Sequence, residues 1–334
     1  MAAPATQPRA TPGVALPPPR EREAHERFPC FGGECAVLVR GRGPAGNAQE
    51  AVTRVRRRML AWHAQLSRFD PASELSQLNR DPRRTVPVSP VMASFLTAAV
   101  SAARMSGGLV DPTLLGEVEA AGYRAHFSGD PIPLRRALAL APPRRPAAPS
   151  PLGGWRLVAV DRAAGTVTRP PGVLLDSGGI AKGLFADVVA EPLSGHASFA
   201  VNAAGDLSFG GAAGLPRPVQ VTDPFDGSVL HVFERLRGAA ATSGISRRSW
   251  LDGDGVPAHH LLDPARGTPA FTGVVQVTAL APSAVVAETL AKAALLSGPV
   301  RAPSWLVHGG LVVRDDGSHV VVEPGGVMAT GGAR

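Results

Sequence analysis

Apolar positions recur with helical spacing through much of the first 110 residues. The segment 47–69 places large apolar side chains three or four residues apart and ends at an Asp-Pro step, which predicts one helix. Ser73 can cap a short second helix, and residues 91–105 predict a third that a Gly-Gly pair closes. Before them, residues 34–40 alternate as a strand does. We expect helices to dominate this part of the chain.

From Trp155 onward the pattern changes to short alternating segments separated by Gly and Asp turns. We predict strands within residues 155–161, 165–169, 172–176, 198–211, 218–223, 228–234, 274–280, 311–313 and 319–323. After the strand at 274–280, a helix should start behind Pro282 with Ser283 as its N-cap and stop at Gly298. This mixed order predicts an α+β fold built in layers rather than from regular βαβ units.

Length and composition limit the domain organisation. The 334 residues are 44% apolar and 18% charged, which is ample for one large domain. Residues 1–27 are rich in Pro and Arg and predict a disordered tail, and residues 323–334 predict a second, fraying tail. A Pro- and Arg-rich segment near 141–154 is either an exposed loop or a soft boundary, and we keep it within a single domain, 28–322.

Charge and cysteine content exclude several classes of protein. The net charge of +7 is spread along a chain with only 5% aromatic residues, so it does not predict nucleic-acid binding. Cys30 and Cys35 are the only cysteines and lack the further ligands that a zinc site needs. No apolar run approaches the roughly 18 residues of a membrane span, and the first residues lack the apolar core of a signal peptide. We therefore expect a cytoplasmic protein without a membrane segment.

Residues 173–187, VLLDSGGIAKGLFAD, carry the clearest chemistry. An apolar run ending at Asp176 predicts a buried strand, paired glycines let the backbone approach a ligand, and a helix starts around Lys182. A helix N-terminus and an ammonium at one place predict an anion site. The pattern is neither GxGxxG nor GxxxxGK[ST], and a plain strand-turn-helix with one exposed lysine is the competing interpretation. The only other lysine is Lys292.

Four further clusters have an ordinary structural interpretation beside a functional one. Residues 202–206 predict a hairpin turn, and the hydroxyls at 242–243 suit either a phosphate or a loop. The tandem histidines 259–260 are structural or include a general base. Glu288 and Lys292, four apart on one helix face, predict a surface ion pair worth about 0.2–0.5 kcal/mol. Glu288 is also a possible metal ligand, whereas Lys292 is not.

Taken together, these motifs resemble one family. The set comprises SRFDPASELSQLN, GGLVDPTLLG, LLDSGGIAKG, VNAAGD, ATSG, HHLLDPARG and APSAVVAETLAKA, in this order. It resembles the FAD:protein FMN transferase family, known as ApbE, over nearly everything from Phe28 to Gly298. The resemblance implies an α+β, ApbE-like fold related to the T-fold, with mixed sheets and packed helices.

The resemblance also implies an activity. Family members hold FAD in a cleft and, with Mg²⁺, transfer its FMN half to a threonine or serine of an acceptor flavoprotein, releasing AMP. Some members instead hydrolyse FAD to FMN and AMP. Attack of a hydroxyl on the FMN-side phosphorus depends mostly on positioning and charge neutralisation. The acceptor flavoprotein is thus the expected partner, and no nucleic acid is expected.

Site residues follow from the resemblance motif by motif. The expected FAD contacts are Phe31, Asp111, Asp176, Lys182, Leu262, Thr242 and Ser243, where Phe31 replaces a common Met-Gly-Thr segment and can stack on a ring. His260 matches a family histidine, which we predict to be the base or to orient the acceptor hydroxyl, with Lys182 assisting catalysis. The carbonyl of Gly179 and the positions of Glu288 and Lys292 match metal ligands.

Lys292 is the main departure from the family pattern. An ammonium beside Glu288 repels a dication, although a glutamate alone binds Mg²⁺ well. We expect the Lys292 ammonium to stand where the metal would, paired with Glu288 and lying against the FAD pyrophosphate. The alternative function is an FAD-binding protein of the same fold with a degenerate metal site and weak or no transfer, or an FAD pyrophosphatase. A second departure is Ser246, where the family commonly has tyrosine.

Overall fold

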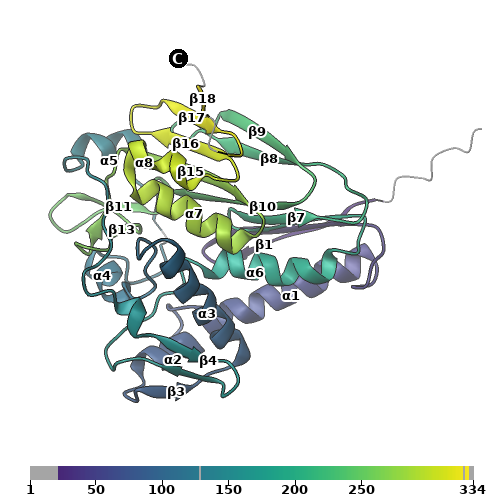
Figure 1. Cartoon of the computed structure of the whole chain (residues 1–334), viewed down its shortest axis with the longest axis horizontal. Helices are drawn as coiled ribbons and strands as arrows, with labels where there is room; N and C mark the ends of the chain where they lie inside the picture. The colour runs from purple at the N-terminus through teal and green to yellow at the C-terminus, as the bar shows by residue number, and fades with distance from the viewer. Residues whose placement is uncertain (1–21, 128, 326–327, 331–334) are drawn as a thin grey trace, which may run out of the picture.

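A nine-stranded antiparallel sheet organises the part of the chain that the computed structural model describes, residues 22–127, 129–325 and 328–330 (Figure 1). The order is β1-β2-β6-β7-β10-β15-β16-β17-β18. These strands are β1 (Ala24–Cys30), β2 (Gly33–Arg40), β6 (Ser198–Ala203), β7 (Asp206–Gly210), β10 (Gly238–Gly244), β15 (Val274–Ala281), β16 (Gly310–Arg314), β17 (His319–Val322) and β18 (Met328–Thr330). The predicted α+β class is confirmed.

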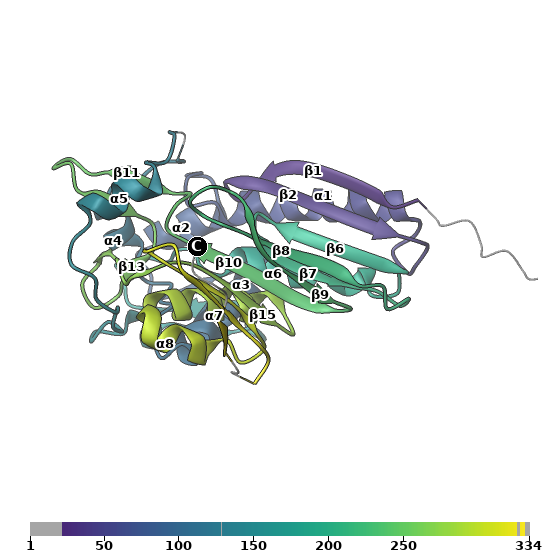
Figure 2. The same cartoon turned by 90° about the horizontal axis from the view of Figure 1, so that it is seen from above.

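Three helices cover one face of this sheet. Helix α1 (Ala48–Leu66) packs on β1 and β2, α6 (Ala181–Ala190) on β6 and β7, and α7 (Ala284–Leu296) on β10 and β15. The hairpin of β8 (Arg217–Thr222) and β9 (Val229–Arg235) lies over the other face, as the view from above shows (Figure 2). Covered on both faces, β15 is buried along its whole length, which explains its continuous apolar run.

Shorter elements complete the molecule, and most of those labelled in Figures 1 and 2 lie beside one end of the sheet. The helices are α2 (Glu74–Arg80), α3 (Pro90–Met105), α4 (Leu115–Ala120), α5 (Leu134–Leu140), η1 (Gly154–Leu157), η2 (Glu191–Leu193) and α8 (Gly298–Trp305). The strands are β3 (Thr85–Pro87), β4 (Ala159–Asp161), β5 (Thr166–Thr168), β11 (Ser249–Leu251), β12 (Pro257–His259), β13 (Leu262–Asp263) and β14 (Thr268–Pro269). None of the described helices is both long and apolar enough to cross a bilayer.

Helix starts follow the predicted caps with one exception. The hydroxyl of Ser73 accepts from the backbone of Ser76 and caps α2, as predicted. Ser283 occupies the N-cap position of α7, but its side chain makes no capping bond. The carboxylate of Asp187 accepts instead from the backbone N–H groups of Ala284, at 2.7 Å, and Val285, at 3.0 Å. A cap from α6 therefore fixes the start of α7.

Helices α6 and α7 also exchange a cap in the other direction. The carboxylate of Glu288 in α7 accepts from the backbone N–H of Gly183 in the first turn of α6, at 2.9 Å. Close approach makes this possible, because a Cβ on Gly183 would lie 2.6 Å from the carbonyl oxygen of Ala284. Each helix therefore satisfies a free N–H group at the start of the other.

Two predicted strands have a different structure. Residues 173–176 form no strand, because the amide of Asn79 hydrogen-bonds both backbone groups of Leu175, at 2.8 Å each, and Asp176 N–H donates to Pro112. The predicted strand 155–161 starts as the 3₁₀ turn η1, and only its end pairs as β4. The predicted burial is confirmed for Leu175 alone, since the other residues of 173–176 are half-buried, and the backbone partner was not predicted.

Both predicted tails contain paired backbone at their inner ends. Strand β1 starts at Ala24, which pairs with Val39, so residues 24–27 are not part of a tail. Its alternation was weak in the sequence because the inward positions of its first half are the small Ala24 and the polar Glu26. Residues 328–330 pair with β17 as β18, which corrects the predicted tail 323–334. Residues 1–21 and 331–334 of the predicted tails lie outside the described residues.

Candidate active site

A cavity lies where the helices on the sheet meet the loops at its end. Its wall includes the β1–β2 turn, the end of α1, the loop 109–114, the turn 176–182, Arg248 and the segment 260–262. Eight predicted site residues line it: Phe31, Asp111, Asp176, Gly179, Lys182, His260, Leu262 and Lys292. Residues that are up to 261 positions apart in the sequence are therefore brought to one site. Glu288 is not part of the wall but contacts two residues that are, Lys182 and Lys292.

Thr242 and Ser243 are outside this wall, so their contact with the cofactor stays a prediction from the sequence. Both belong to β10, an inner strand of the sheet, and pair with Thr278 and Val277 of β15. The hydroxyl of Thr242 bonds that of Thr278 at 2.8 Å, and Ser243 is 7% exposed. Thr242 itself is exposed, and because both residues lie on a strand, the loop interpretation of this motif is wrong.

The predicted hairpin turn at 202–206 is confirmed and ends next to the cavity. Ala204 and Gly205 both have positive φ, 53° and 106°, as the tight turn of a two-residue hairpin requires. Asn202 accepts from the N–H of Gly205 at 2.8 Å and fixes the turn. Asp206 then starts β7 with its side chain buried, 1% exposed. The turn places a carboxylate beside α6 rather than in solvent.

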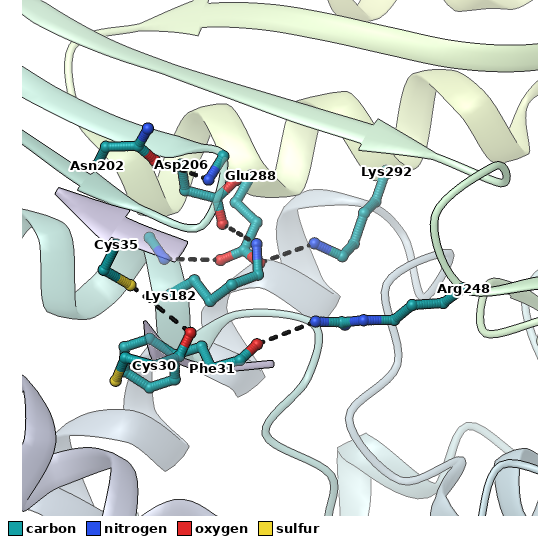
Figure 3. A network of polar contacts seen from close by, with 11 residues as sticks. Cys30, Phe31, Cys35, Lys182, Asn202, Asp206, Arg248, Glu288 and Lys292 are labelled. Atoms are coloured by element: carbon teal, nitrogen blue, oxygen red, sulfur yellow. Dashed lines mark hydrogen bonds and ion pairs between the residues drawn. The ribbon is translucent and has the colours of Figure 1, made fainter. Parts of the chain in front are cut away.

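Four ionisable side chains meet in one buried cluster (Figure 3). Lys182 pairs with Asp206 through a short contact and with Glu288 at 3.4 Å. Lys292 donates to the same Glu288 oxygen at 2.9 Å. The two carboxyl groups are fully buried or nearly so, and Lys292 is 8% exposed. The predicted surface pair of Glu288 and Lys292 is therefore an interior pair, and Lys182 is not an exposed, unpaired charge.

Burial and charge set the protonation of this cluster. Burial, reinforced by repulsion from Glu288, raises the pKa of Asp206 to about 7. Burial would also raise the pKa of Glu288, but the ammonium groups of Lys292 and Lys182 outweigh it and hold that pKa below its usual range. Burial would lower the pKa of Lys182, but Asp206 and Glu288 raise it. Glu288 is thus an ionised carboxylate between two ammonium groups.

The residues around Glu288 do not fit a magnesium ion. One of its oxygens takes both ammonium groups and the other takes the N–H of Gly183. A dication about 4 Å from one ammonium is repelled by roughly 8 kcal/mol at an effective dielectric of about 20. Within the described residues, no group of three or more His, Cys, Asp or Glu side chains is placed to hold a metal. Gly179, Glu288 and Lys292, whose positions match metal ligands in the family, therefore do not fit a dication in this arrangement.

The tandem histidines have separate roles. His259 is buried, packs edge-on against Phe271 with ring centroids 4.8 Å apart, and burial lowers its pKa to about 3. His260 lines the cavity, and burial, reinforced by the nearby guanidinium of Arg248, holds its pKa well below the usual range. Its Nδ1 atom is buried and has no hydrogen-bond partner within the described residues. A neutral imidazole at the cavity can accept a proton, as a general base must.

Phe31 closes the cavity from the β1–β2 turn. Its backbone has a φ of 54°, which non-glycine residues rarely adopt, and the following Gly32 has a φ of 68°. Arg248 donates to the Phe31 carbonyl at 3.0 Å and holds this turn. The ring packs against His63 and Phe185 with centroids 5.0 and 5.6 Å apart. An aromatic ring thus lines the cavity, as predicted.

Arg68 and its aromatic neighbours were missed by the sequence analysis. The guanidinium lies over the rings of Phe69, at 4.2 Å, and Tyr123, at 4.5 Å, and reaches Asp176 at 3.4 Å. Its Nη1 atom is buried without a hydrogen-bond partner among the described residues. The signal was present, because Arg68 and Phe69 lie inside the motif SRFDPASELSQLN and aromatic residues are scarce in this chain.

Asp111 and Asp176 present carboxyl groups to the same cavity. Burial raises the pKa of Asp111, whose Oδ1 accepts from Thr113 while Oδ2 is buried without a hydrogen-bond partner in the described structure. Ser177 donates to the Leu66 carbonyl at 2.8 Å and holds the turn that follows Asp176. These groups are positioned and incompletely satisfied, which is typical of a binding site.

The fold and the cavity define a single-domain α+β protein with a ligand site between sheet-backed helices and loops. A sequence model described as the ApbE family matches residues 31–313, and the chain belongs to that family.

Relatives and solved structures agree with this assignment. The chain is 28% identical over 297 residues to an FAD:protein FMN transferase of Treponema pallidum, covering 84% of this chain and 80% of that protein. It is 28% identical over 307 residues to one of Rhodobacter capsulatus, covering 89% of this chain and 56% of that longer protein. The crystal structure of an ApbE protein of Thermotoga maritima superposes with a TM-score of 0.73 at 26% identity, over 89% of this chain and 96% of the other.

Proposed function

We propose that this protein is an FAD:protein FMN transferase. FAD binds in the cavity, a threonine or serine hydroxyl of an acceptor flavoprotein attacks the FMN-side phosphorus, and AMP leaves. One O–P bond forms, and the bond from that phosphorus to the bridging pyrophosphate oxygen breaks. Membership of the ApbE family and the names of the relatives support this activity. The compartment in which the acceptor is met stays a prediction from the sequence.

The placement of His260 is the single observation that carries the proposal. Its imidazole lines the cavity, is held neutral, and has a buried Nδ1 without a hydrogen-bond partner in the described structure. In the proposed step this ring takes the proton of the acceptor hydroxyl as the oxygen attacks phosphorus. His259, one residue earlier, is packed into the core and takes no part.

The remaining cavity residues bind and orient FAD in this proposal. The turn 176–182 and the ammonium groups of Lys182 and Lys292 face the pyrophosphate, where negative charge concentrates during transfer. Phe31 and the Arg68 stack offer flat surfaces to the rings of FAD. Asp111 and Asp176 supply polar contacts. Magnesium has no role at Glu288 in this proposal, because that carboxylate is already paired with two ammonium groups.

A second function remains in competition because one observation favours it. The carboxylate that would hold a metal is engaged by Lys182 and Lys292, as expected for a flavin-binding protein that has lost transfer. In that case FAD binds, but no AMP is released. A related outcome is FAD pyrophosphatase activity, in which water replaces the acceptor hydroxyl.

One experiment separates these functions. The protein is incubated with FAD and an unmodified flavoprotein domain whose threonine can receive FMN. Mass spectrometry follows the mass of the acceptor, and a second assay follows the release of AMP. We expect a covalent FMN adduct with one AMP per adduct. His260→Gln should slow AMP release about 10²–10⁴-fold while FAD affinity changes little. FAD binding without adduct or AMP would contradict the proposal, and AMP without adduct would indicate hydrolysis.

A further inference from the structure

The side chain of Lys292 occupies the space between the two elements that the family resemblance assigns to a metal. Its ammonium bonds Glu288 at 2.9 Å, and its Cε lies 3.9 Å from where a Cβ on Gly179 would be. Figure 3 shows this contact with Glu288, and Lys292 also lines the cavity. The aliphatic stem of this lysine therefore fills the interval between α7 and the turn at Gly179.

The hydrogen bonding of Lys292 leaves donors for a ligand. An ammonium has three N–H donors, and within the described residues Glu288 is the one hydrogen-bond partner of Lys292. Glu288 does not depend on Lys292 for a partner, because Lys182 and the N–H of Gly183 already contact its two oxygens. Lys182 is also paired with Asp206, so it is Lys292 whose remaining N–H donors are available to a ligand in the cavity.

Given the proposed transfer of FMN, we propose that the ammonium of Lys292, supported by Lys182, takes the place of the divalent cation at the FAD pyrophosphate. It neutralises the bound pyrophosphate and then the AMP that leaves. The chain therefore binds and cleaves FAD without a divalent metal. Compared with an ion, a lysine is a permanent charge that needs no loading and cannot be removed by chelation.

The first test needs only the wild-type protein. FAD affinity, from the quenching of flavin fluorescence, and AMP release are measured with EDTA and with excess Mg²⁺. We expect both quantities to agree within about twofold, since no dication is bound near the pyrophosphate. A gain of about tenfold or more with Mg²⁺, in affinity or in AMP release, overturns the inference.

Variants of Lys292 sharpen this test. Lys292→Met keeps the length and removes the charge, and should weaken FAD binding about tenfold or more with and without Mg²⁺. Lys292→Thr also removes the ammonium but leaves Glu288 accessible, so its FAD binding should become dependent on Mg²⁺. Unchanged FAD affinity in both variants overturns the inference.

A matched control distinguishes the loss of a charge at the cavity from a change in the net charge of the protein. Arg144→Met removes one positive charge from a pair with Asp315, 2.7 Å long and outside the cavity wall. It should leave FAD affinity unchanged. Melting curves confirm that each variant is folded.

The failure of this inference differs from the failure of the proposed function. If an adduct forms only with Mg²⁺, the protein is a transferase and Lys292 is not a substitute for the metal. If FAD binds in EDTA and depends on Lys292 but no AMP appears, the role in binding the pyrophosphate stands and the transfer is refuted. If FAD does not bind under any condition, both are refuted.

Discussion

Two regions of the cavity are built differently. In the first, Lys182, Asp206, Glu288 and Lys292 project from two helices and a strand and bond one another. In the second, the Arg68 stack and Arg248 lie in loops, and Arg68 is held by ring contacts, a hydrogen bond to the Tyr123 carbonyl and an ion pair with Asp176. Regular elements fix charge where the geometry must not vary, whereas loops supply flat surfaces that can adapt to a ligand. We call these the charged wall and the stacked wall.

Removal of Lys182 should have the largest effect, because the charged wall depends on it. At about pH 8, above the pKa of Asp206, Lys182→Met leaves an ionised Asp206 buried without its cation and should lower the free energy of unfolding by about 3–5 kcal/mol. Lys292→Met should cost clearly less, since Glu288 keeps Lys182 and Gly183 as partners. Urea unfolding measures both. Equal losses of unfolding free energy in the two variants would mean that Lys182 is no more important than Lys292 to the stability of the charged wall.

Arg68 provides the corresponding test of the stacked wall. Arg68→Lys keeps the charge but loses the planar group that lies over Phe69 and Tyr123, so FAD affinity should fall about tenfold. The maximal rate of AMP release at saturating FAD should change little, because Arg68 is assigned to binding. Fluorescence titration and AMP assays distinguish the two quantities. A loss confined to the maximal rate would place Arg68 on the catalytic side instead.

A third test is a dependence of stability on pH that belongs to the charged wall. Burial raises the pKa of Asp206 from 3.8 to about 7, so the folded state holds a proton that the unfolded state has lost. The resulting stabilisation is complete below about pH 4 and disappears as pH rises through about 7. Urea unfolding of Asp206→Asn over this window should show a weaker fall in stability than the wild type. Parallel curves would show that Asp206 is already ionised in the folded protein.

Features with a strong local signal could be predicted from the sequence, whereas contacts between distant residues could not. Helices α1, α3 and α7 and the turn at Ala204 carry strong local signals, and their positions were predicted within a few residues. The charged wall was partly predicted because Lys182, Glu288 and Lys292 lie in recognisable motifs. Its pairing was not, since Asp206 is 24 residues from Lys182 and only the fold brings them together.

Wrong predictions arose where a local pattern did not specify its partner. The apolar run at 173–176 satisfies its backbone through the amide of Asn79, a side chain 96 residues away from Leu175. Thr242 and Ser243 have the composition of a phosphate loop but lie on an inner strand. Arg68 was overlooked because its importance depends on Tyr123, which belongs to a separate loop. Residues whose role depends on distant loops cannot be ranked from one sequence.

The reciprocal caps of α6 and α7 have a consequence for how the protein opens. Asp187 caps α7 while Glu288 caps α6, so the first turns of the two helices share their hydrogen bonds. Neither first turn can fray without releasing the other, and the amide hydrogens of Gly183, Ala284 and Val285 should exchange with solvent as one cooperative group. A shift of either helix by one residue along its axis would break both caps and separate Lys182 from Glu288. The spacing of the charges in the charged wall therefore depends on α6 and α7 moving together as one mechanical unit.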